Sequence, residues 1–247
     1  MTVLDQTGRT AEALALGESY LTRTHSNRRI LFRTGWVLGF LWESARAEVV
    51  FRRLIAMDPG GIYDAWGHGE IAYMRRARGD GAGAVAAMTE AVASRPADAI
   101  SRVGLEHFRL NIGQYREAIP RLTEEIRLDP AARAYGNTPA VLLLGWAHLQ
   151  AGDTAAARRV LDPYEARMRQ AGTLEWLVPL LSIEGRVEEA VAIAERLPIP
   201  RLYGSPTPND RMLDGVREHP RYQAIVRQAQ AQVSAKRTAM GLRELAP

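Results

Sequence analysis

The chain of 247 residues is long enough for one large domain or two small ones. Its 47% hydrophobic and 24% charged residues exclude a disordered polymer and a coiled-coil rod, and the absence of cysteine excludes disulfides and thiolate chemistry. The net charge of +4 arises from basic and acidic residues that are interleaved, without the basic stripe or reading motif of a nucleic-acid-binding protein.

The sequence predicts helices along the whole chain, mostly in pairs. A lone helix is expected over residues 7–22, and helix pairs are expected over 29–57, 64–95, 99–128, 138–170 and 173–197. A linker over 131–137 precedes the fifth unit, and four prolines mark residues 198–208 as an extended connector. A short helix and a final helix follow, and we expect the residues after about 234 to be frayed.

Three kinds of marker recur along these units. A small residue opens each second helix, at Ala13, Ala47, Ala84, Ala118, Ala157 and Ala190, with spacings of 34, 37, 34, 39 and 33 residues. A glycine marks the turn between helices at Gly8, Gly79, Gly113, Gly152 and Gly185, and a proline closes the second helix at Pro59, Pro96 and Pro130. Glycine suits the left-handed end of a helix, and proline cannot continue one.

This pattern resembles the tetratricopeptide repeat (TPR) family, whose unit is about 34 residues long. The best match is the segment Ala99 to Pro130, which contains Gly113, Tyr115 and Ala118 at the family's spacing. The resemblance implies an all-α, right-handed superhelical solenoid of antiparallel helix pairs, with about five and a half repeats over residues 1–197. Such repeats are stable because neighbours stack on one another.

Several positions depart from the family's pattern. Trp42 stands where a turn glycine is expected, and Glu106 and Glu125 occupy positions that are usually small. Pro163 and Pro179 lie inside expected helices, and each is predicted to break or kink its helix near the preceding residue.

Residues 198–247 are predicted to form a Pro-rich connector followed by capping helices. The residues Pro220, Arg221, Tyr222 and Ile225 resemble the closing segment of TPR arrays in bacterial multidomain regulators. A solenoid end exposes apolar surface unless another segment covers it, so capping is the expected role.

The TPR resemblance implies a concave groove lined by the first helix of each pair. Carried over position by position, the groove residues are Arg29, Phe32, Trp36 and Phe40, then Trp66, Tyr73 and Arg76, then Ile100, Val103, His107, Leu110 and Asn111, and finally Leu142, Trp146 and Gln150. Aromatic and arginine residues are the usual anchors of protein interfaces. Two alternatives remain: the aromatics pack within the array, or the C-terminal segment folds back over them.

No candidate for chemistry stands out. The five histidines form no zinc motif, and the segment Gly79 to Gly83 follows a helix, so it is an inter-helix turn and not a phosphate loop. No cofactor, metal site or catalytic residue is expected, and the chain is predicted not to be an enzyme.

The hypothesis is therefore a cytoplasmic, non-catalytic protein-interaction scaffold that binds a peptide or helix in the aromatic groove. Arg29, Arg76, Asn111 and Gln150 would orient the ligand. Phe32 and Trp36 replace the polar clamp residues of TPR proteins that bind chaperone tails, which argues against that partner. The alternative is a regulatory or sensory domain of a signalling or transcription-regulating protein, with a small apolar ligand. Self-association through the N-terminal end is a further expectation, whereas nucleic acid and membranes are not expected partners.

Overall fold

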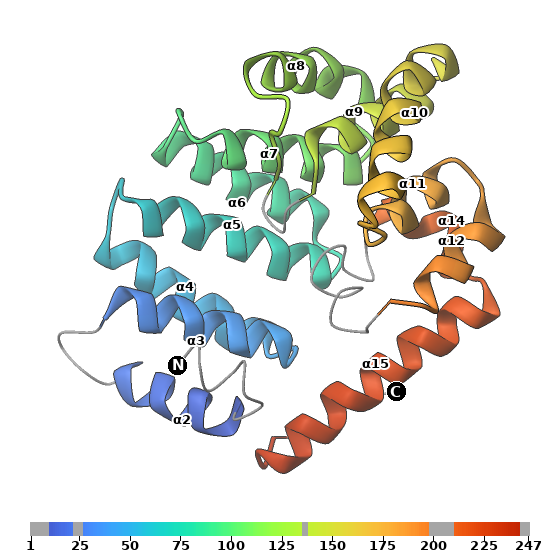
Figure 1. Cartoon of the computed structure of the whole chain (residues 1–247). Coiled ribbons are helices and arrows are strands. Elements are labelled where there is room, and N and C mark those ends of the chain that lie inside the picture. Colours follow the sequence, from blue (N-terminus) through green and yellow to red (C-terminus); the bar gives the residue numbers. More distant parts are fainter. Residues whose placement is uncertain (1–9, 22–26, 135–137, 198–209, 243–247) are drawn as a thin grey trace.

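The computed structural model describes residues 10–21, 27–134, 138–197 and 210–242, and these residues form an array of paired helices (Figure 1). The first helices are α2 (Thr10–Leu21), α3 (Arg28–Phe40), α4 (Ser44–Met57), α5 (Ile62–Ala77), α6 (Gly81–Ser94), α7 (Ala99–Asn111) and α8 (Tyr115–Leu128). They are followed by α9 (Ala140–Gln150), α10 (Thr154–Ala171), α11 (Leu177–Ile183), α12 (Val187–Ala194), the 3-10 turn η2 (Arg211–Leu213), α14 (Asp214–Arg217) and α15 (Pro220–Ala239). The all-α repeat fold expected from the sequence is confirmed.

Side-chain caps begin several of these helices. The Asn27 side chain accepts hydrogen bonds from the backbone of α3, and Asp80, Asp98 and Asp153 cap α6, α7 and α10 in the same way. Such caps satisfy amide groups that have no partner within the helix. The chain therefore starts its helices where short polar side chains stand.

The turns between paired helices use the left-handed backbone conformation. Gly79, Gly113, Gly152 and Gly185 all have positive φ angles, as the turn pattern predicts. Trp42 adopts a φ of 59° at the turn between α3 and α4, and thus takes the conformation that glycine has in the other turns. The turn therefore keeps the same backbone conformation although tryptophan stands in place of glycine.

Within a pair, a glycine of the first helix lets a large side chain of the second approach. A Cβ atom at Gly35 would lie 2.5 Å from the Phe51 ring, and one at Gly145 would lie 2.3 Å from the Leu161 side chain. Phe51 and Leu161 are buried, so they have no free space to move into. The pairs pack closely because these positions lack a side chain.

The first helices of successive pairs form the inner layer of the array. α3 contacts α5, α5 contacts α7, α7 contacts α9 and α9 contacts α11, whereas successive second helices approach one another less closely. The array therefore curves with its first helices on the concave side (Figure 1). This is the layer in which the predicted groove residues lie.

Both prolines predicted to interrupt helices are accommodated without a break. Pro163 is predicted to break or kink its helix, but α10 continues from Thr154 to Ala171 through Pro163, so the helix is not broken there. α11 begins at Leu177, so that Pro179 falls in its first turn, where a missing amide costs no helical hydrogen bond.

The two acidic residues at small positions are balanced by arginines. Glu106 pairs with Arg109 at 2.6 Å and with Arg121 at 3.5 Å, and Glu125 receives two hydrogen bonds from Arg102. Ion pairs thus replace the close apolar contact expected there.

The C-terminal elements pack on the sixth unit, α11 and α12, and then cross the molecule. η2 and α14 lie against α11, where a Cβ atom at Gly215 would come within 2.4 Å of the Ser182 carbonyl oxygen. From there α15 runs back toward the N-terminal helices (Figure 1). The prediction of fraying after residue 234 is wrong, because α15 is helical to Ala239 and Arg237 near its end is buried.

Candidate functional site

Three aromatic side chains form a ridge on the first helix of the second unit. Phe32, Trp36 and Phe40 are four residues apart along α3, a spacing that places them on one helix face. Their neighbouring ring centroids are 5.9 and 5.8 Å apart. Phe32 is half-buried, whereas Trp36 is 37% exposed and Phe40 is 52% exposed. We refer to these three residues as the aromatic ridge.

Further aromatic rings support the buried end of the ridge. The Phe32 ring lies 5.3 Å from Trp66, 6.0 Å from Phe51 and 6.1 Å from Tyr63, measured between centroids. Tilted and edge-on rings at these distances attract one another beyond their simple burial. Phe32 and Trp66 thus act mainly as a rigid base, and Trp36 and Phe40 are the accessible part.

A buried carboxyl group fixes the orientation of Trp36. The indole Nε1 of Trp36 donates a hydrogen bond to Oε1 of Glu70 at 2.7 Å. Burial raises the pKa of Glu70 to about 7, against the opposing effects of the Trp36 hydrogen bond and the Arg33 charge. The Arg33 guanidinium lies 5.1 Å from the Trp36 ring centroid. Trp36 is therefore held in place from two sides.

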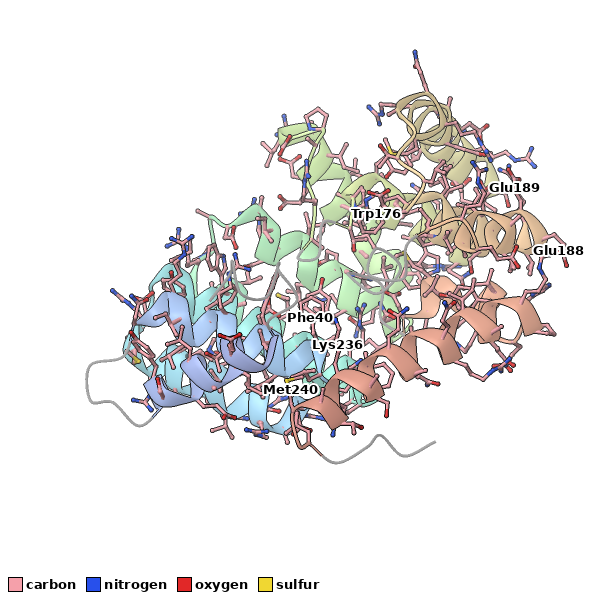
Figure 2. The ribbon with its side chains drawn as sticks, turned by 60° about the horizontal axis from the view of Figure 1, so that its bottom comes forward. Phe40, Trp176, Glu188, Glu189, Lys236 and Met240 are labelled. Atoms are coloured by element: carbon pink, nitrogen blue, oxygen red, sulfur yellow. The ribbon has the colours of Figure 1, made fainter. Side chains whose placement is uncertain are left out.

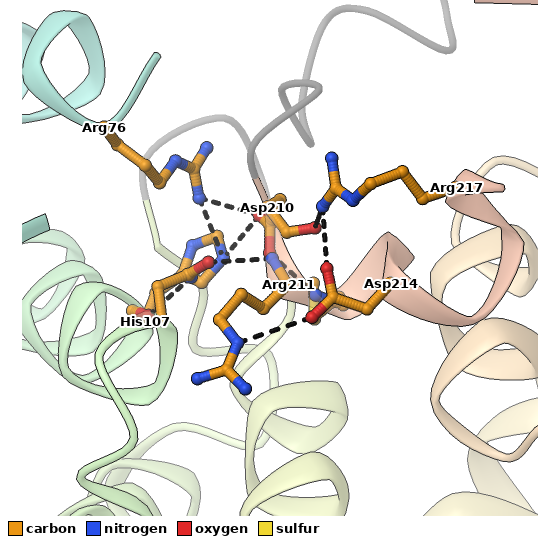
Figure 3. A network of polar contacts seen from close by, with 8 residues as sticks. Arg76, His107, Asp210, Arg211, Asp214 and Arg217 are labelled. Carbon is orange, nitrogen blue, oxygen red and sulfur yellow. Dashed lines mark hydrogen bonds and ion pairs between the residues drawn. The ribbon is translucent and has the colours of Figure 1, made fainter. Parts of the chain in front are cut away.

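The middle of the concave face holds a buried polar network that joins three distant elements (Figure 3). Asp210, just before η2, accepts a hydrogen bond at 2.7 Å from Arg76 of α5. Its same oxygen lies 2.8 Å from Nε2 of His107 in α7. All three side chains are buried, and the second oxygen of Asp210 caps η2 by accepting from the amide of Met212.

The charges in this network determine its protonation. Burial opposes the ionisation of Asp210, but Arg76 and His107 outweigh it and hold the pKa of the carboxyl far below its usual range. Burial lowers the pKa of His107, so the ring is neutral at pH 7. The contact with Asp210 favours the tautomer whose Nε2 carries the proton, since only that form donates to the carboxylate. The network is therefore a charge pair with a neutral histidine donor.

Asn111 adds a second contact between α7 and the C-terminal segment. Its side-chain oxygen accepts a hydrogen bond at 2.9 Å from the Arg211 amide, while its nitrogen donates to the His107 carbonyl. The alternative in which the C-terminal segment folds back over the groove is thus observed at Arg76, His107 and Asn111.

The remaining predicted groove residues lie in different surroundings. Tyr73 is buried against Phe108, with ring centroids 5.1 Å apart, and Trp146 is 2% exposed and contacts Tyr115. Arg29 and Gln150 are exposed. Trp146 is a core residue and offers no contact area on an open surface. Of the predicted set, Arg29, Trp36, Phe40, Ile100 and Gln150 are exposed.

Three residues of this region were not among the predicted set. Asp210 and Arg237 belong to the C-terminal segment, and Glu70 lies beneath Trp36. Only the position of Glu70 near Trp36 could have been inferred from the sequence, because Glu70 lies one repeat period, 34 residues, after Trp36.

Among the residues that the structure describes, no group of three or more His, Asp or Glu side chains is arranged to hold a metal ion. Nor does any described helix combine the length and apolar character that crossing a bilayer requires.

The family comparison identifies part of the array. Residues 110–173, from the end of α7 through α10, match the tetratricopeptide repeat family model. The TPR assignment made from the recurring glycine, alanine and proline markers is thereby confirmed for this segment. No curated protein matches the sequence.

Among solved structures, the chain is similar to one described as the structure of Naa15/Naa10 bound to HypK-THB. The sequences are 11% identical, the TM-score is 0.44, and the match covers 97% of this chain and 34% of that one. This chain thus spans about a third of the length of that protein.

Proposed function

Because this chain contains tetratricopeptide repeats, we propose that it is a non-catalytic protein-interaction scaffold that binds a peptide or helix along the aromatic ridge. The observation that carries the proposal is the exposure of Trp36 and Phe40 next to each other on the concave layer. Single exposed apolar residues are common on protein surfaces, but adjacent large aromatics on one helix face favour a binding surface.

The ridge has the properties of an interface anchor. Its buried base of aromatic rings and the Trp36–Glu70 hydrogen bond leave Trp36 little freedom to lose when a partner binds. Fully burying an aromatic side chain contributes about 1.5–3 kcal/mol. Two such side chains, already held in place, therefore supply a central apolar contact for a short segment.

The polar residues that orient a partner differ from those expected. Arg76 and Asn111 contact the chain's own C-terminal segment, whereas Arg29 lies exposed on the same helix as the ridge, and Arg33 lies over Trp36. We assign the orienting role to Arg29 and Arg33. Gln150 has an orienting role only for a ligand that is long enough to reach α9.

The experiment is affinity capture from a lysate of the source organism with the full chain and its variants. Trp36→Ala/Phe40→Ala removes the exposed part of the ridge. We expect at least one protein to be retained by the wild type and lost with this variant, because hot-spot aromatics dominate binding. The retained proteins are compared by mass spectrometry.

Val49→Ala/Leu128→Ala provides the matched control, because both residues are exposed and lie on second helices, α4 and α8. Phe40→Ala alone leaves the Trp36–Glu70 hydrogen bond intact and separates lost contact from altered folding. Identical sets of retained proteins for the wild type and the ridge variant would contradict the proposal.

A small apolar ligand is the second candidate that the ridge allows, within a regulatory or sensory protein. The rings of Phe32, Trp36 and Phe40 form a row along one face of α3, with the first two rings tilted and the last two T-shaped, and such a row fits an extended partner better than a small molecule. A screen of metabolites by tryptophan fluorescence separates the two, since only the small-ligand function gives a saturable change without a protein.

A further inference from the structure

The last helix of the chain is long but little of it is packed. α15 has 20 residues, and only Tyr222, Ala229 and Arg237 are buried. Its central sequence, Arg227 to Gln232, is mostly polar and exposed. A helix of this length that buries so few side chains is held by contacts near its ends, and not by a continuous apolar face.

The far end of α15 is attached to the second unit of the array. Arg237 donates a hydrogen bond to the carbonyl of Leu41, which ends α3, and pairs with Glu43 at 2.7 Å. Just beyond the helix, Met240 and Leu242 pack against the N-terminal core cluster. We refer to these contacts of Arg237, Met240 and Leu242 as the far anchor.

The near end of the C-terminal segment is attached much more firmly. Asp210 is fully buried between Arg76 and His107, Met212 and Leu213 of η2 are buried, and η2 packs on α11. Separating a buried charge pair is strongly destabilising, because it leaves a buried charge without its partner. The near end therefore stays in place when the far end moves.

The far anchor is the weaker of the two for a physical reason. Glu43 keeps 19% of its side-chain surface exposed and also lies 3.7 Å from Arg46, so it retains a cationic neighbour when Arg237 leaves. Arg237 itself is buried, but Met240 and Leu242 beside it are only partly buried, whereas Asp210, Met212 and Leu213 at the near end are all buried.

The far anchor lies next to the aromatic ridge. Phe40 is the residue immediately before Leu41, and Lys236 is the residue immediately before Arg237. In Figure 2 Phe40, Lys236 and Met240 lie close together, in agreement with the hydrogen bond between Arg237 and Leu41. A segment bound along the ridge to Phe40 therefore meets the end of α15.

From these contacts we propose that η2, α14 and α15 form a strap, fixed at Asp210 and releasable at Arg237, that closes the concave side of the array beside the aromatic ridge and restricts access of macromolecules to it. The gating role rests on the proposed function of the ridge. The strap itself is a property of this chain and is tested without a partner.

The absence of cysteine makes a direct accessibility test possible. Phe40→Cys places one thiol on the ridge, and its rate of modification is measured with N-ethylmaleimide and with maleimide attached to a polyethylene glycol of about 5 kDa. We expect Arg237→Met to raise the rate with the large reagent about tenfold and to leave the rate with the small reagent unchanged. Methionine retains the apolar stem of arginine and removes the anchoring charge.

Two controls and a second test variant accompany this experiment. Lys236→Met changes the adjacent exposed residue and should leave both rates unchanged. Val49→Cys reports on the outer helix α4, where opening the strap should have no effect. Glu43→Gln weakens the same anchor from the side of the array and should act in the same direction as Arg237→Met, which keeps the test decisive if Arg237→Met folds poorly.

Equal rates with the large reagent for the wild type, Arg237→Met and Glu43→Gln would overturn the strap. Because no partner is present, this result is independent of whether the ridge binds a protein. If Arg237→Met raises the rate with the large reagent but the ridge variant captures the same proteins as the wild type, the strap is supported. Only the proposed function is then contradicted.

Discussion

The carboxyl group of Glu70 makes stability depend on pH in an unusual direction. Its pKa rises from an ordinary 4.5 to about 7 in the folded chain, mainly because the group is buried. Between these values the folded state binds more protons than the unfolded state. The free energy of unfolding therefore decreases as the pH rises from about 4.5 to 7, the opposite of what a salt-bridged carboxylate gives.

Glu70→Gln should remove this dependence. The amide oxygen of glutamine can accept the hydrogen bond from Trp36 without ionising. Since one pKa unit corresponds to about 1.4 kcal/mol, we expect the variant to gain roughly 1–3 kcal/mol at pH 8 and little at pH 4.5. Urea unfolding at both pH values measures the difference in stability between the variant and the wild type. An equal difference at the two pH values would show that burial does not shift the pKa of Glu70.

A second residue-level test concerns the buried pair of Arg76 and Asp210, whose atoms lie 2.7 Å apart. Asp210→Ala should cost about 3–5 kcal/mol, because it removes the carboxylate from a buried charge pair. Arg76→Met/Asp210→Ala should cost less than the sum of the two single changes, by about 1–3 kcal/mol. A coupling energy near zero in this double-mutant cycle would mean that the pair does not hold the C-terminal segment.

At the scale of the helix pair, glycine at the inner contact is as important as glycine at the turn. Gly145→Ala would place a Cβ 2.3 Å from the buried Leu161 side chain, and overpacking of this kind costs about 1–3 kcal/mol. In the Leu161→Ala background the same change should cost almost nothing. Thermal unfolding of the four variants measures the coupling, and an equal cost in both backgrounds would contradict the close approach.

The helix pairs could be predicted from the sequence because their determinants are local. Turn glycines such as Gly113 and Gly152, together with the alanines that open second helices, repeat at a nearly constant period, and the observed pairs follow them. Trp42 adopting a positive φ, and Pro163 inside a continuous helix, were not foreseeable, since in both cases the packing of the array overrides the local preference.

At the scale of the molecule, the contacts that close the array had no sequence signal. Asp210 is 134 residues from Arg76, and Arg237 is 196 residues from Leu41, so no periodicity or motif connects them. The aromatic ridge was predictable because Phe32, Trp36 and Phe40 share one helix face, whereas the burial of Trp146 depends on its neighbours. The division at residue 197 and self-association through the N-terminal end stay predictions.

The strap distinguishes this array from an open solenoid, in which distant units are not connected to one another. The array's second and last units are joined through α15, so a partner that binds at the ridge also acts on the C-terminal segment. Binding of a partner and attachment of Arg237 are then coupled, and each weakens the other by the same free energy.

The most direct test of the account is the affinity of a captured partner segment for the purified full chain, measured by calorimetry. The account predicts that Trp36→Ala/Phe40→Ala weakens binding at least about 30-fold, as the loss of hot-spot aromatics worth 2 kcal/mol or more requires. It also predicts that Val49→Ala/Leu128→Ala, on the outer helices, leaves the affinity unchanged. Equal affinities for the wild type and the ridge variant would contradict the central claim that the concave aromatic ridge is the binding surface.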